Sequence, residues 1–328
     1  LGFVERGSHS SLACFPGQQL ENNYSLNTVD ICPVGALTSD DFRFRMRSWF
    51  LKETPTICTE SSVGSNVSAA SREGVVYRVA PRRNDAVNDS WMTDSGRELY
   101  KEILAKERVT AFRVGSREAS SSDALQAAAA LLSKPGVAVV GSGLCSVEEQ
   151  FLLKKIADCL EAPAFLMGHF GEEDGLLLSA DRRPNLRGAL ATGLISRYPA
   201  DNLKALGRRI AKGEVKTVFC VREDLFESGL TPEQLKEIRV VHLATMKNKT
   251  SRKASVLLPA LTSFERNGTF INQQFRLQKF LQAVPGPAGT LPDVLLLNRL
   301  LSELRGEEAT AISLDDLWME LGNRRDSI

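Results

Sequence analysis

The sequence predicts an α/β protein, with a small turn-rich N-terminal region followed by a larger module built around a mostly parallel sheet. Three observations carry this fold class. The N-terminal stretch clusters turn signals such as FPGQQLENN and CPVG. The middle of the chain alternates short apolar runs with amphipathic stretches at helical spacing over roughly 130 residues, which is typical of a Rossmann-like module. The composition, 43% hydrophobic and 25% charged, is that of a globular protein.

The elements expected in the N-terminal third are short. A helix is expected over residues 39–46, where Thr38 or Ser39 can cap the first turn. The stretch REGVVYRVAPR alternates in polarity and carries β-branched residues, which predicts a hairpin strand. A second helix is expected around residues 96–106.

The alternating module opens with a serine-capped, alanine-rich helix within residues 119–133. The strands expected after it are VAVVGSG, AFLMG, VKTVFCV and VVHLATM, and ASVLLPA is a further short apolar run. The helices expected between them are VEEQFLLKKIADCLE, NLKALGRRIAKG, which ends at a glycine, and TPEQLKEI, which begins with a proline. A further helix is expected over residues 291–304, and the polar tail after it contains one amphipathic stretch, SLDDLWMELG.

Length and charge exclude several functional classes. The 328 residues are enough for two or three domains with a sizeable core. A net charge of +1 gives no electrostatic support for binding nucleic acid or a membrane surface. No apolar run approaches the roughly 20 residues of a membrane helix, so we expect no direct membrane insertion. The chain opens on LGFVERGSH without a methionine, and we expect it to be a processed protein or a piece of a longer one.

Most of the residues that could bind a metal or a cofactor have an ordinary structural interpretation. Cys145, Cys159 and Cys220 are expected to be small buried hydrophobes, and Cys14 has no visible partner. Because the third glycine of the dinucleotide fingerprint is missing after Gly141 and Gly143, a tight strand-to-helix turn is favoured there over a phosphate site.

The three histidines and two charge-rich stretches also have ordinary structural interpretations. None of the histidines has a metal-ligand companion at suitable spacing. His242, inside an apolar strand, is expected to be a core residue with satisfied hydrogen bonds, and no nucleophile elbow accompanies His169. The charged stretches 171–174 and 221–226 are expected to be solvated loops.

Cys32, in CPVGAL, stands apart from the other cysteines. A cysteine followed by proline commonly ends an iron–sulfur ligand run, because the turn directs backbone N–H groups at sulfur. One thiolate cannot hold a [4Fe–4S] cluster, which requires four ligands.

The first hundred residues, with CPVGAL and FRFRMRSWFLKETPTIC, resemble the large iron–sulfur subunit of complex-I-type NADH:quinone oxidoreductases. The resemblance implies that Cys32 is the fourth ligand of a [4Fe–4S] cluster whose other ligands lie upstream of Leu1. It implies electron transfer from NADH and flavin towards quinone, with the other peripheral-arm subunits as partners. The expected location is peripheral, on the cytoplasmic face of a bacterial inner membrane.

A second cluster motif of this superfamily, C-x2-C-x3-C-x27-C, matches Cys58, Ser61, Ser65 and Thr93 in position. Three of its four sulfurs are replaced by hydroxyl groups, which stay protonated and bind iron–sulfur clusters poorly. We therefore expect a degenerate site with no second cluster.

The segment VLLPALTSFERNGTFINQQFRLQ is similar to a segment of molybdopterin oxidoreductases. The matching residues are Glu265, Gly268, Thr269, Phe270, Asn272, Arg276 and Gln278. Because the chain is much shorter than those enzymes and the neighbouring cluster site is degenerate, we expect no molybdopterin.

The resemblance divides the chain into four parts. Residues 1–48 correspond to the end of a ferredoxin-like [4Fe–4S] region, and residues 50–106 to a degenerate cluster domain of molybdopterin enzymes. Residues 107–305 form the α/β domain, and residues 306–328 a polar tail. The expected function is an electron-transfer iron–sulfur subunit, not catalytic by itself. A cofactor-free docking module of the same complex and, third, a formate-dehydrogenase-type molybdenum enzyme are the alternatives.

Overall fold

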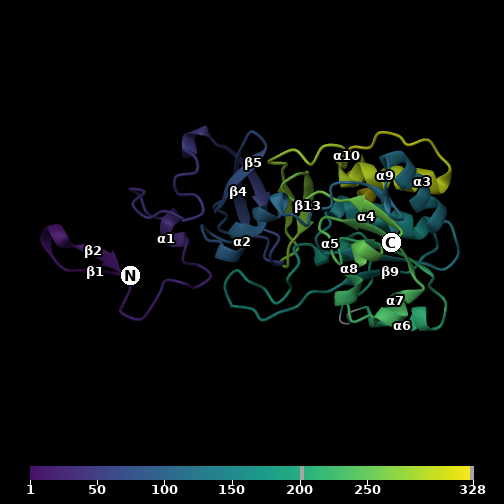
Figure 1. Ribbon diagram of the computed structural model, residues 1–328, viewed down its shortest axis with the longest axis horizontal. Helices are drawn as coiled ribbons and strands as arrows, with labels where there is room; N and C mark the ends of the chain where they lie inside the picture. Colours follow the sequence, from purple (N-terminus) through teal and green to yellow (C-terminus); the bar gives the residue numbers. More distant parts are fainter. Residues whose placement is uncertain (200–202, 326–328) are drawn as a thin grey trace.

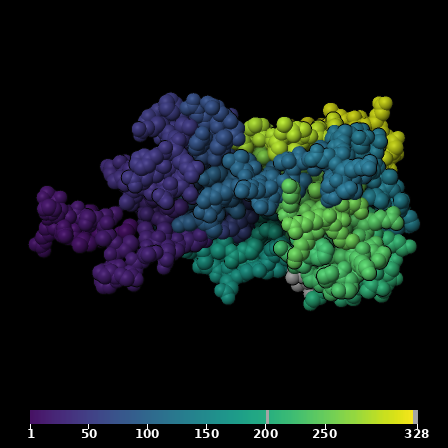
Figure 2. Space-filling model, viewed as in Figure 1, coloured from purple at the N-terminus to yellow at the C-terminus, as the bar shows by residue number. Residues whose placement is uncertain are grey.

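The computed structural model describes residues 1–199 and 203–325. Figure 1 shows an elongated molecule, with the N-terminal residues at one end and a large α/β module at the other. In the space-filling view the first residues project as a thin extension away from the rest (Figure 2). None of the helices in the described ranges is long and apolar enough to cross a membrane.

The N-terminal region consists of short elements. Strands β1 (Gly2–Val4) and β2 (Ser11–Ala13) pair antiparallel, and helix α1 (Asn27–Asp30) precedes Cys32. The helix expected over residues 39–46 does not form, and this prediction is wrong. That segment is a series of turns in which Phe44 has a φ of +62°, a left-handed conformation incompatible with a continuing helix.

A three-stranded antiparallel sheet follows, formed by β3 (Lys52–Ile57), β4 (Asn66–Arg72) and β5 (Val75–Pro81). The predicted hairpin strand is β5, joined to β4 by Glu73 and Gly74, whose φ values of +51° and +80° suit a two-residue hairpin turn. Helix α2 (Asp94–Glu98) continues into a 3-10 helix (Leu99–Leu104), so the helix expected near residue 96 exists but tightens after one turn.

The module contains a seven-stranded sheet of order β7-β6-β12-β11-β10-β8-β9. Its five parallel strands are β8 (Val137–Ser142), β9 (Ala164–Met167), β10 (Thr217–Val221), β11 (Arg239–Ala244) and β12 (Val256–Pro259). The short strands β6 (Arg113–Val114) and β7 (Arg117–Glu118) extend one edge antiparallel. The expected mixed α/β fold with a mostly parallel sheet is confirmed.

Helices cover both faces of this sheet. Apolar residues of α3 (Ser121–Leu132), α4 (Val147–Cys159), α5 (Leu186–Ala191), α9 (Asp293–Arg305) and α10 (Leu314–Arg325) share one core with alternate strand residues such as Val139 and Phe219. The remaining strand residues, such as Val140 and Val218, pack against α6 (Lys204–Ala211) and α7 (Pro232–Lys236). This alternation is what a parallel sheet buried on both faces requires.

A hairpin joins the module to the three-stranded sheet. Strands β13 (Gly268–Ile271) and β14 (Leu277–Phe280) pair antiparallel, and the rings of Phe270 and Phe280 stack with centroids 4.4 Å apart beside Ile57. The hairpin occupies the segment similar to molybdopterin oxidoreductases. Gly268 is required there, because a Cβ would lie 2.7 Å from Phe280 and 2.8 Å from Ser146. The remaining short helix, α8 (Lys249–Lys253), follows β11.

Candidate functional site

Cys32 lies in a tight turn directly after α1. Pro33 follows it, and Gly35, with a φ of +64°, donates its N–H to the Cys32 carbonyl at 3.3 Å. The backbone N–H groups of Leu37, Ala36, Val34 and Gly35 point at the thiol and lower the pKa of Cys32 below its usual range. A set of N–H donors around one sulfur favours the thiolate, which is the form that binds metal.

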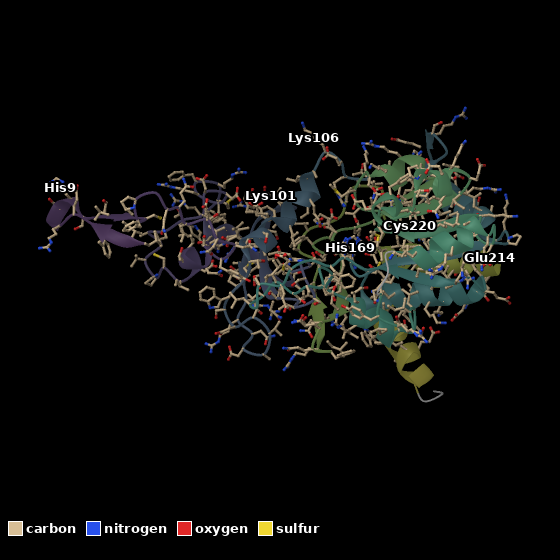
Figure 3. All side chains as sticks on the ribbon, turned by 90° about the horizontal axis from the view of Figure 1, so that it is seen from below. His9, Lys101, Lys106, His169, Glu214 and Cys220 are labelled. Carbon is tan, nitrogen blue, oxygen red and sulfur yellow. The ribbon has the colours of Figure 1, made fainter. Side chains whose placement is uncertain are left out.

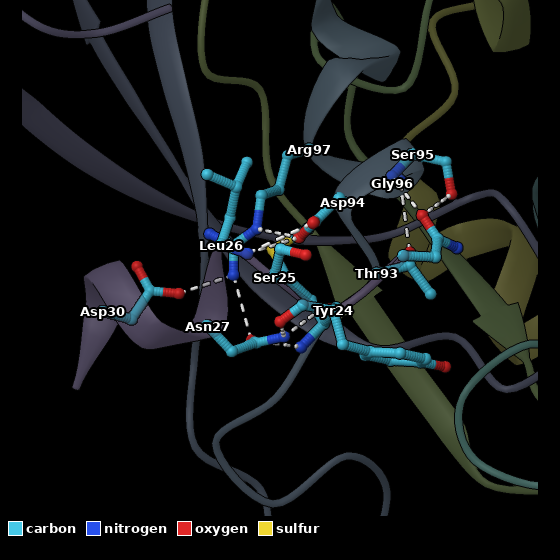
Figure 4. Close-up of polar contacts among 12 residues, drawn as sticks. Tyr24, Ser25, Leu26, Asn27, Asp30, Thr93, Asp94, Ser95, Gly96 and Arg97 are labelled. Atoms are coloured by element: carbon cyan, nitrogen blue, oxygen red, sulfur yellow. Dashed lines mark hydrogen bonds and ion pairs between the residues drawn. The ribbon is translucent and has the colours of Figure 1, made fainter. Parts of the chain in front are cut away.

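Helix α1 is held against residues 92–97 by a network of polar contacts (Figure 4). The Asn27 side chain donates to the Met92 carbonyl at 2.8 Å and accepts the Met92 N–H at 3.1 Å. Both carboxylate oxygens of Asp94 accept the Leu26 N–H at 3.1 Å. The network therefore attaches the turn that contains Cys32 to the segment that begins α2.

Arg97 is the central cation of this network. Its guanidinium lies 2.5 Å from Asp30 and 3.5 Å from Asp94, and it donates to the Asn27 side chain at 3.0 Å. Burial raises the pKa of Asp94, while the Leu26 N–H and Arg97 oppose that rise. Sequence reasoning missed these residues, because nothing in the spacing of Asp30 and Arg97 indicates that they meet.

Of the four degenerate cluster positions, Cys58 and Thr93 come together. A Cβ on Gly96 would lie 2.8 Å from Cys58 Sγ and 2.6 Å from Thr93 Oγ1, so Gly96 leaves room for both side chains. Thr93 caps α2 by accepting the Gly96 N–H at 3.2 Å, and its hydroxyl also donates to Glu60. Burial raises the pKa of Cys58 to about 12, so it is a neutral thiol at neutral pH.

Ser61 and Ser65 have structural roles. The Ser61 hydroxyl donates to the Leu177 carbonyl at 3.1 Å, which turns it towards the module. The Ser65 carbonyl accepts the Cys58 N–H at 2.9 Å and closes the loop between β3 and β4. No group of three or more His, Cys, Asp or Glu side chains in the described part of the chain could hold a metal ion.

A long loop connects the module to the N-terminal region. Residues 168–185, here called the bridging loop, leave the end of β9 and return to α5. The Tyr24 hydroxyl donates to Asp174 at 2.5 Å and accepts the Leu177 N–H at 3.1 Å. Figure 1 shows the loop reaching from the module towards the blue N-terminal sheet.

His169, labelled in Figure 3, lies at the module end of the bridging loop. Its Nε2 lies 2.6 Å from Glu223. The Ser142 hydroxyl also donates to Glu223. Because both the serine and the histidine contact the carboxylate and the serine is fully buried, this arrangement is not a hydrolytic triad.

The expectation of a solvated loop over residues 221–226 is wrong. Glu223 is 1% exposed and Asp224 is 9% exposed, and the Arg222 side chain forms an ion pair with Asp293. Asp224 accepts the Lys249 N–H at 3.1 Å and the Thr250 hydroxyl at 2.7 Å. These charged side chains are buried because each has partners on other elements.

The remaining candidates have mixed outcomes. Cys145 and Cys220 are buried as expected, whereas Cys159, the last residue of α4, is exposed, because that position faces solvent. His242 is buried, as expected of a core residue; neither ring nitrogen has a hydrogen bond of ordinary geometry among the described residues, although the Glu223 backbone acts on the ring. Burial lowers the pKa of His242 to about 4, which keeps the ring neutral.

The glycine turn after β8 is tightly packed. A Cβ on Gly143 would lie 2.6 Å from Arg183, and one on Gly141 would lie 3.0 Å from Leu194. Because these glycines lack a Cβ, neighbouring side chains can pack against the backbone here, which supports the tight turn expected from the sequence. Asn185, fully buried, donates to the Cys145 carbonyl at 2.7 Å and accepts the Ile271 N–H at 2.7 Å.

Three family models match this chain. Residues 1–38 match the ferredoxin-like domain of NADH-quinone oxidoreductase subunit 3, which includes Cys32. Residues 51–101 match the NDSU1/NuoG-like 4Fe-4S domain of NADH-ubiquinone oxidoreductase, and residues 188–303 match molybdopterin oxidoreductase.

Curated relatives carry matching names. The NADH-quinone oxidoreductase G subunit of Rickettsia felis is 34% identical over 177 residues, covering 52% of this chain and 26% of that protein. The G subunit of Rickettsia prowazekii is 30% identical over 234 residues, covering 66% of this chain and 34% of that protein. The mitochondrial NADH dehydrogenase [ubiquinone] iron-sulfur protein 1 of Solanum tuberosum is 42% identical over 100 residues, covering 30% of this chain and 14% of that protein.

The chain is a homologue of these NADH-quinone oxidoreductase G subunits. It spans a quarter to a third of the length of the Rickettsia relatives, with 26% and 34% of those proteins covered. The match to the ferredoxin-like model ends within the turn after Cys32, and the NuoG-like match contains all four positions from Cys58 to Thr93. The iron–sulfur resemblance of the sequence is thus confirmed by the family models that match residues 1–38 and 51–101.

Proposed function

We propose that this chain contributes Cys32 to one [4Fe–4S] cluster in the iron–sulfur subunit of a complex-I-type NADH:quinone oxidoreductase. The subunit passes electrons that originate from NADH and flavin towards quinone, and this chain alone is not catalytic. The observation that carries the proposal is the turn at Cys32, where four backbone N–H groups lower the pKa of the thiol. Its homology to subunits named for this complex supports the same function.

The residues present fit one ligand position of such a cluster. When bound, a [4Fe–4S] cluster supplies one-electron transfer at a potential set partly by hydrogen bonds to sulfur. Cys32 would hold one iron, and the N–H groups of residues 34–37 would stabilise the negative charge on its sulfur. The other ligands belong, in this proposal, to a segment preceding Leu1.

Cys58 binds no second cluster in this proposal. Its thiol is buried with a pKa raised to about 12, and Ser61 is directed to Leu177 instead of towards Cys58. A thiol that stays protonated and hydroxyl groups engaged elsewhere do not provide four soft ligands.

The protein also binds no molybdopterin in this proposal. The cavity at the carboxyl edge of the parallel sheet is only about 130 Å³, far below the roughly 300–1,000 Å³ of typical cofactor pockets. The module then acts as a Rossmann-like scaffold, with its parallel strands in the order β9-β8-β10-β11-β12.

The finer organisation follows from the same proposal. Residues 1–48 complete a ferredoxin-like region, residues 50–106 form the degenerate cluster domain, residues 107–305 form the scaffold, and residues 306–328 form a tail. Its partners are other peripheral-arm subunits, and it lies on the cytoplasmic face of a bacterial inner membrane without entering it.

A cofactor-free docking module is the second candidate. It is favoured by the finding that the described residues contain no group of three potential metal ligands. The two functions differ in one property, which is whether Cys32 binds iron in the full-length protein.

The test is an iron count on the full-length protein expressed anaerobically, combined with low-temperature EPR. We expect Cys32→Ala to lose roughly four irons and one EPR signal, because a [4Fe–4S] cluster rarely survives loss of a thiolate. Cys58→Ala is the matched control and should keep all iron. Unchanged iron in Cys32→Ala would leave the docking module as the function.

A further inference from the structure

The cavity at the carboxyl edge of the parallel sheet contains unused polar groups. It is lined by residues that follow four parallel strands: Leu144 after β8, Arg222 after β10, Thr245 after β11, and Thr262 after β12. In open α/β sheets, this edge is where ligands bind. Glu102 reaches the same cavity from the 3-10 helix, on the segment marked by Lys101 and Lys106 in Figure 3.

Three buried donors on the lining have no hydrogen-bond partner among the residues that the structure describes. These are Thr262 Oγ1, Arg222 Nε and Arg266 Nε. Thr262 is 1% exposed and Arg266 is 5% exposed, so water outside the protein does not satisfy them. Buried donors left unpaired cost free energy, so an acceptor inside the cavity would stabilise this edge of the sheet.

Each arginine around the cavity is paired with a carboxylate. Arg266 pairs with Glu149 at 2.6 Å, Arg108 pairs with Glu265 at 2.7 Å, and Arg222 pairs with Asp293. Glu149 lies in the first turn of α4 and Asp293 is the first residue of α9, and neither carboxylate is part of the cavity lining, whereas Arg222 and Arg266 are.

Glu102 is the acidic residue on the lining. Burial raises the pKa of its carboxyl group, against the influence of Arg222 and Arg108. Burial therefore favours the neutral form of this group over the charged form.

Size limits the ligand to a small one. A volume of about 130 Å³ corresponds to about four water molecules at roughly 30 Å³ each. The cavity thus has room for a single tetrahedral ion. Thr245, Met246 and Asn248 are partly exposed and form its mouth, so an ion can enter from solvent.

We propose that this cavity binds a small tetrahedral oxyanion, such as inorganic phosphate, through Thr262, Arg222 and Arg266, with Ser263 beside them on the lining. The anion accepts the three unpartnered donors and completes the hydrogen bonding of the sheet edge. The site is independent of the cluster at Cys32, so either proposal can fail without the other.

Thr262→Val is the sharpest variant, because valine keeps the shape and removes a hydroxyl that has no partner in the described part of the protein. Calorimetric titration of the full-length protein with inorganic phosphate should show binding that weakens about fivefold in Thr262→Val, the effect of one hydrogen bond. Thr56→Val is the matched control, since Thr56 Oγ1 is also buried and has no partner among the described residues, but it lies in β3, away from the cavity. Its phosphate affinity should equal that of the unaltered protein.

Ser263→Ala provides a second readout if Thr262→Val does not fold, and it should weaken phosphate binding to a similar extent. Titration with glycerol phosphate separates a free ion from a phosphate ester, and we expect it to bind more weakly because the cavity is small. Equal phosphate affinity in all variants, or no binding by the unaltered protein, would overturn the proposal. Tighter binding of glycerol phosphate would overturn its free-ion form.

Discussion

At the scale of single residues, local environment separates cysteines that look alike in the sequence. Cys32 is surrounded by backbone N–H groups that lower the pKa of its thiol, whereas burial raises the pKa of Cys58 to about 12. The sequence allowed Cys32 to be singled out, because proline and glycine after a cysteine predict such a turn. It did not reveal that Cys58 is enclosed, because burial depends on residues distant in sequence.

This difference predicts selective alkylation of the iron-free, full-length protein. At neutral pH, iodoacetamide should modify Cys32 at least about tenfold faster than Cys58, because the thiolate is the reactive form. Peptide mass spectrometry over time measures both rates. Cys145, buried with a pKa raised to about 12, is an internal control that should react as slowly as Cys58. Equal rates at Cys32 and Cys58 would contradict the environments described here.

His242 predicts a loss of stability in acid. Its pKa falls from 6.5 to about 4 on folding, so between these pH values the unfolded chain binds the extra proton. The stabilisation is complete above pH 6.5 and is lost as the pH falls towards 4, by at most roughly 3 kcal/mol. Urea unfolding at several pH values should show a shallower acid loss in His242→Leu. His9→Leu, at an exposed histidine, should follow the unaltered protein.

At the scale of elements, the sequence predicted the module better than the N-terminal region. The capped helices α3 and α4 and the apolar strands β8, β10 and β11 carry strong local signals, and each forms near its expected place. The segment 39–46 has a possible cap, but Phe42, Phe44 and Met46 alternate with arginines at a period of two, which does not favour a helix, and the segment forms turns. The β13–β14 hairpin was missed as an element because its packing against Ile57 joins distant parts of the chain.

The attachment of α1 to α2 predicts a specific role for Arg97. Its side chain is 10% exposed and pairs with Asp30 and Asp94, so Arg97→Gln should lower the free energy of local unfolding by roughly 2 kcal/mol, after allowance for partial exposure. Hydrogen exchange should accelerate at the amides of residues 34–37, which surround Cys32.

The control for Arg97 is Lys101→Gln. Lys101 pairs with Asp41 at 2.9 Å, but its side chain is 46% exposed, so its loss should change exchange at residues 34–37 very little. Acceleration of equal size in both variants would mean that charge alone, and not the buried network, holds α1.

At the scale of the whole molecule, three connections among the described residues join the first hundred or so residues to the module. The 3-10 helix leads into the buried ion pair of Arg108 with Glu265, the β13–β14 hairpin packs beside Ile57, and the bridging loop contacts Tyr24. No periodic pattern could predict them, because each depends on contacts between segments far apart in the sequence. The family resemblance indicated which parts exist, and the contacts show how they are held together.

The bridging loop gives the prediction that belongs to this scale. Tyr24→Phe removes the hydroxyl that donates to Asp174 and accepts the Leu177 N–H, at a cost of roughly 1 kcal/mol. Because this hydroxyl connects the loop to the segment just before α1, exchange should accelerate both at residues 174–178 and at residues 23–27. Tyr77→Phe, on β5 and away from the loop, is the matched control. Faster exchange at residues 174–178 alone would show that the N-terminal region holds the loop but the loop does not hold the N-terminal region. Faster exchange at both segments means that the module helps to hold the turn at Cys32.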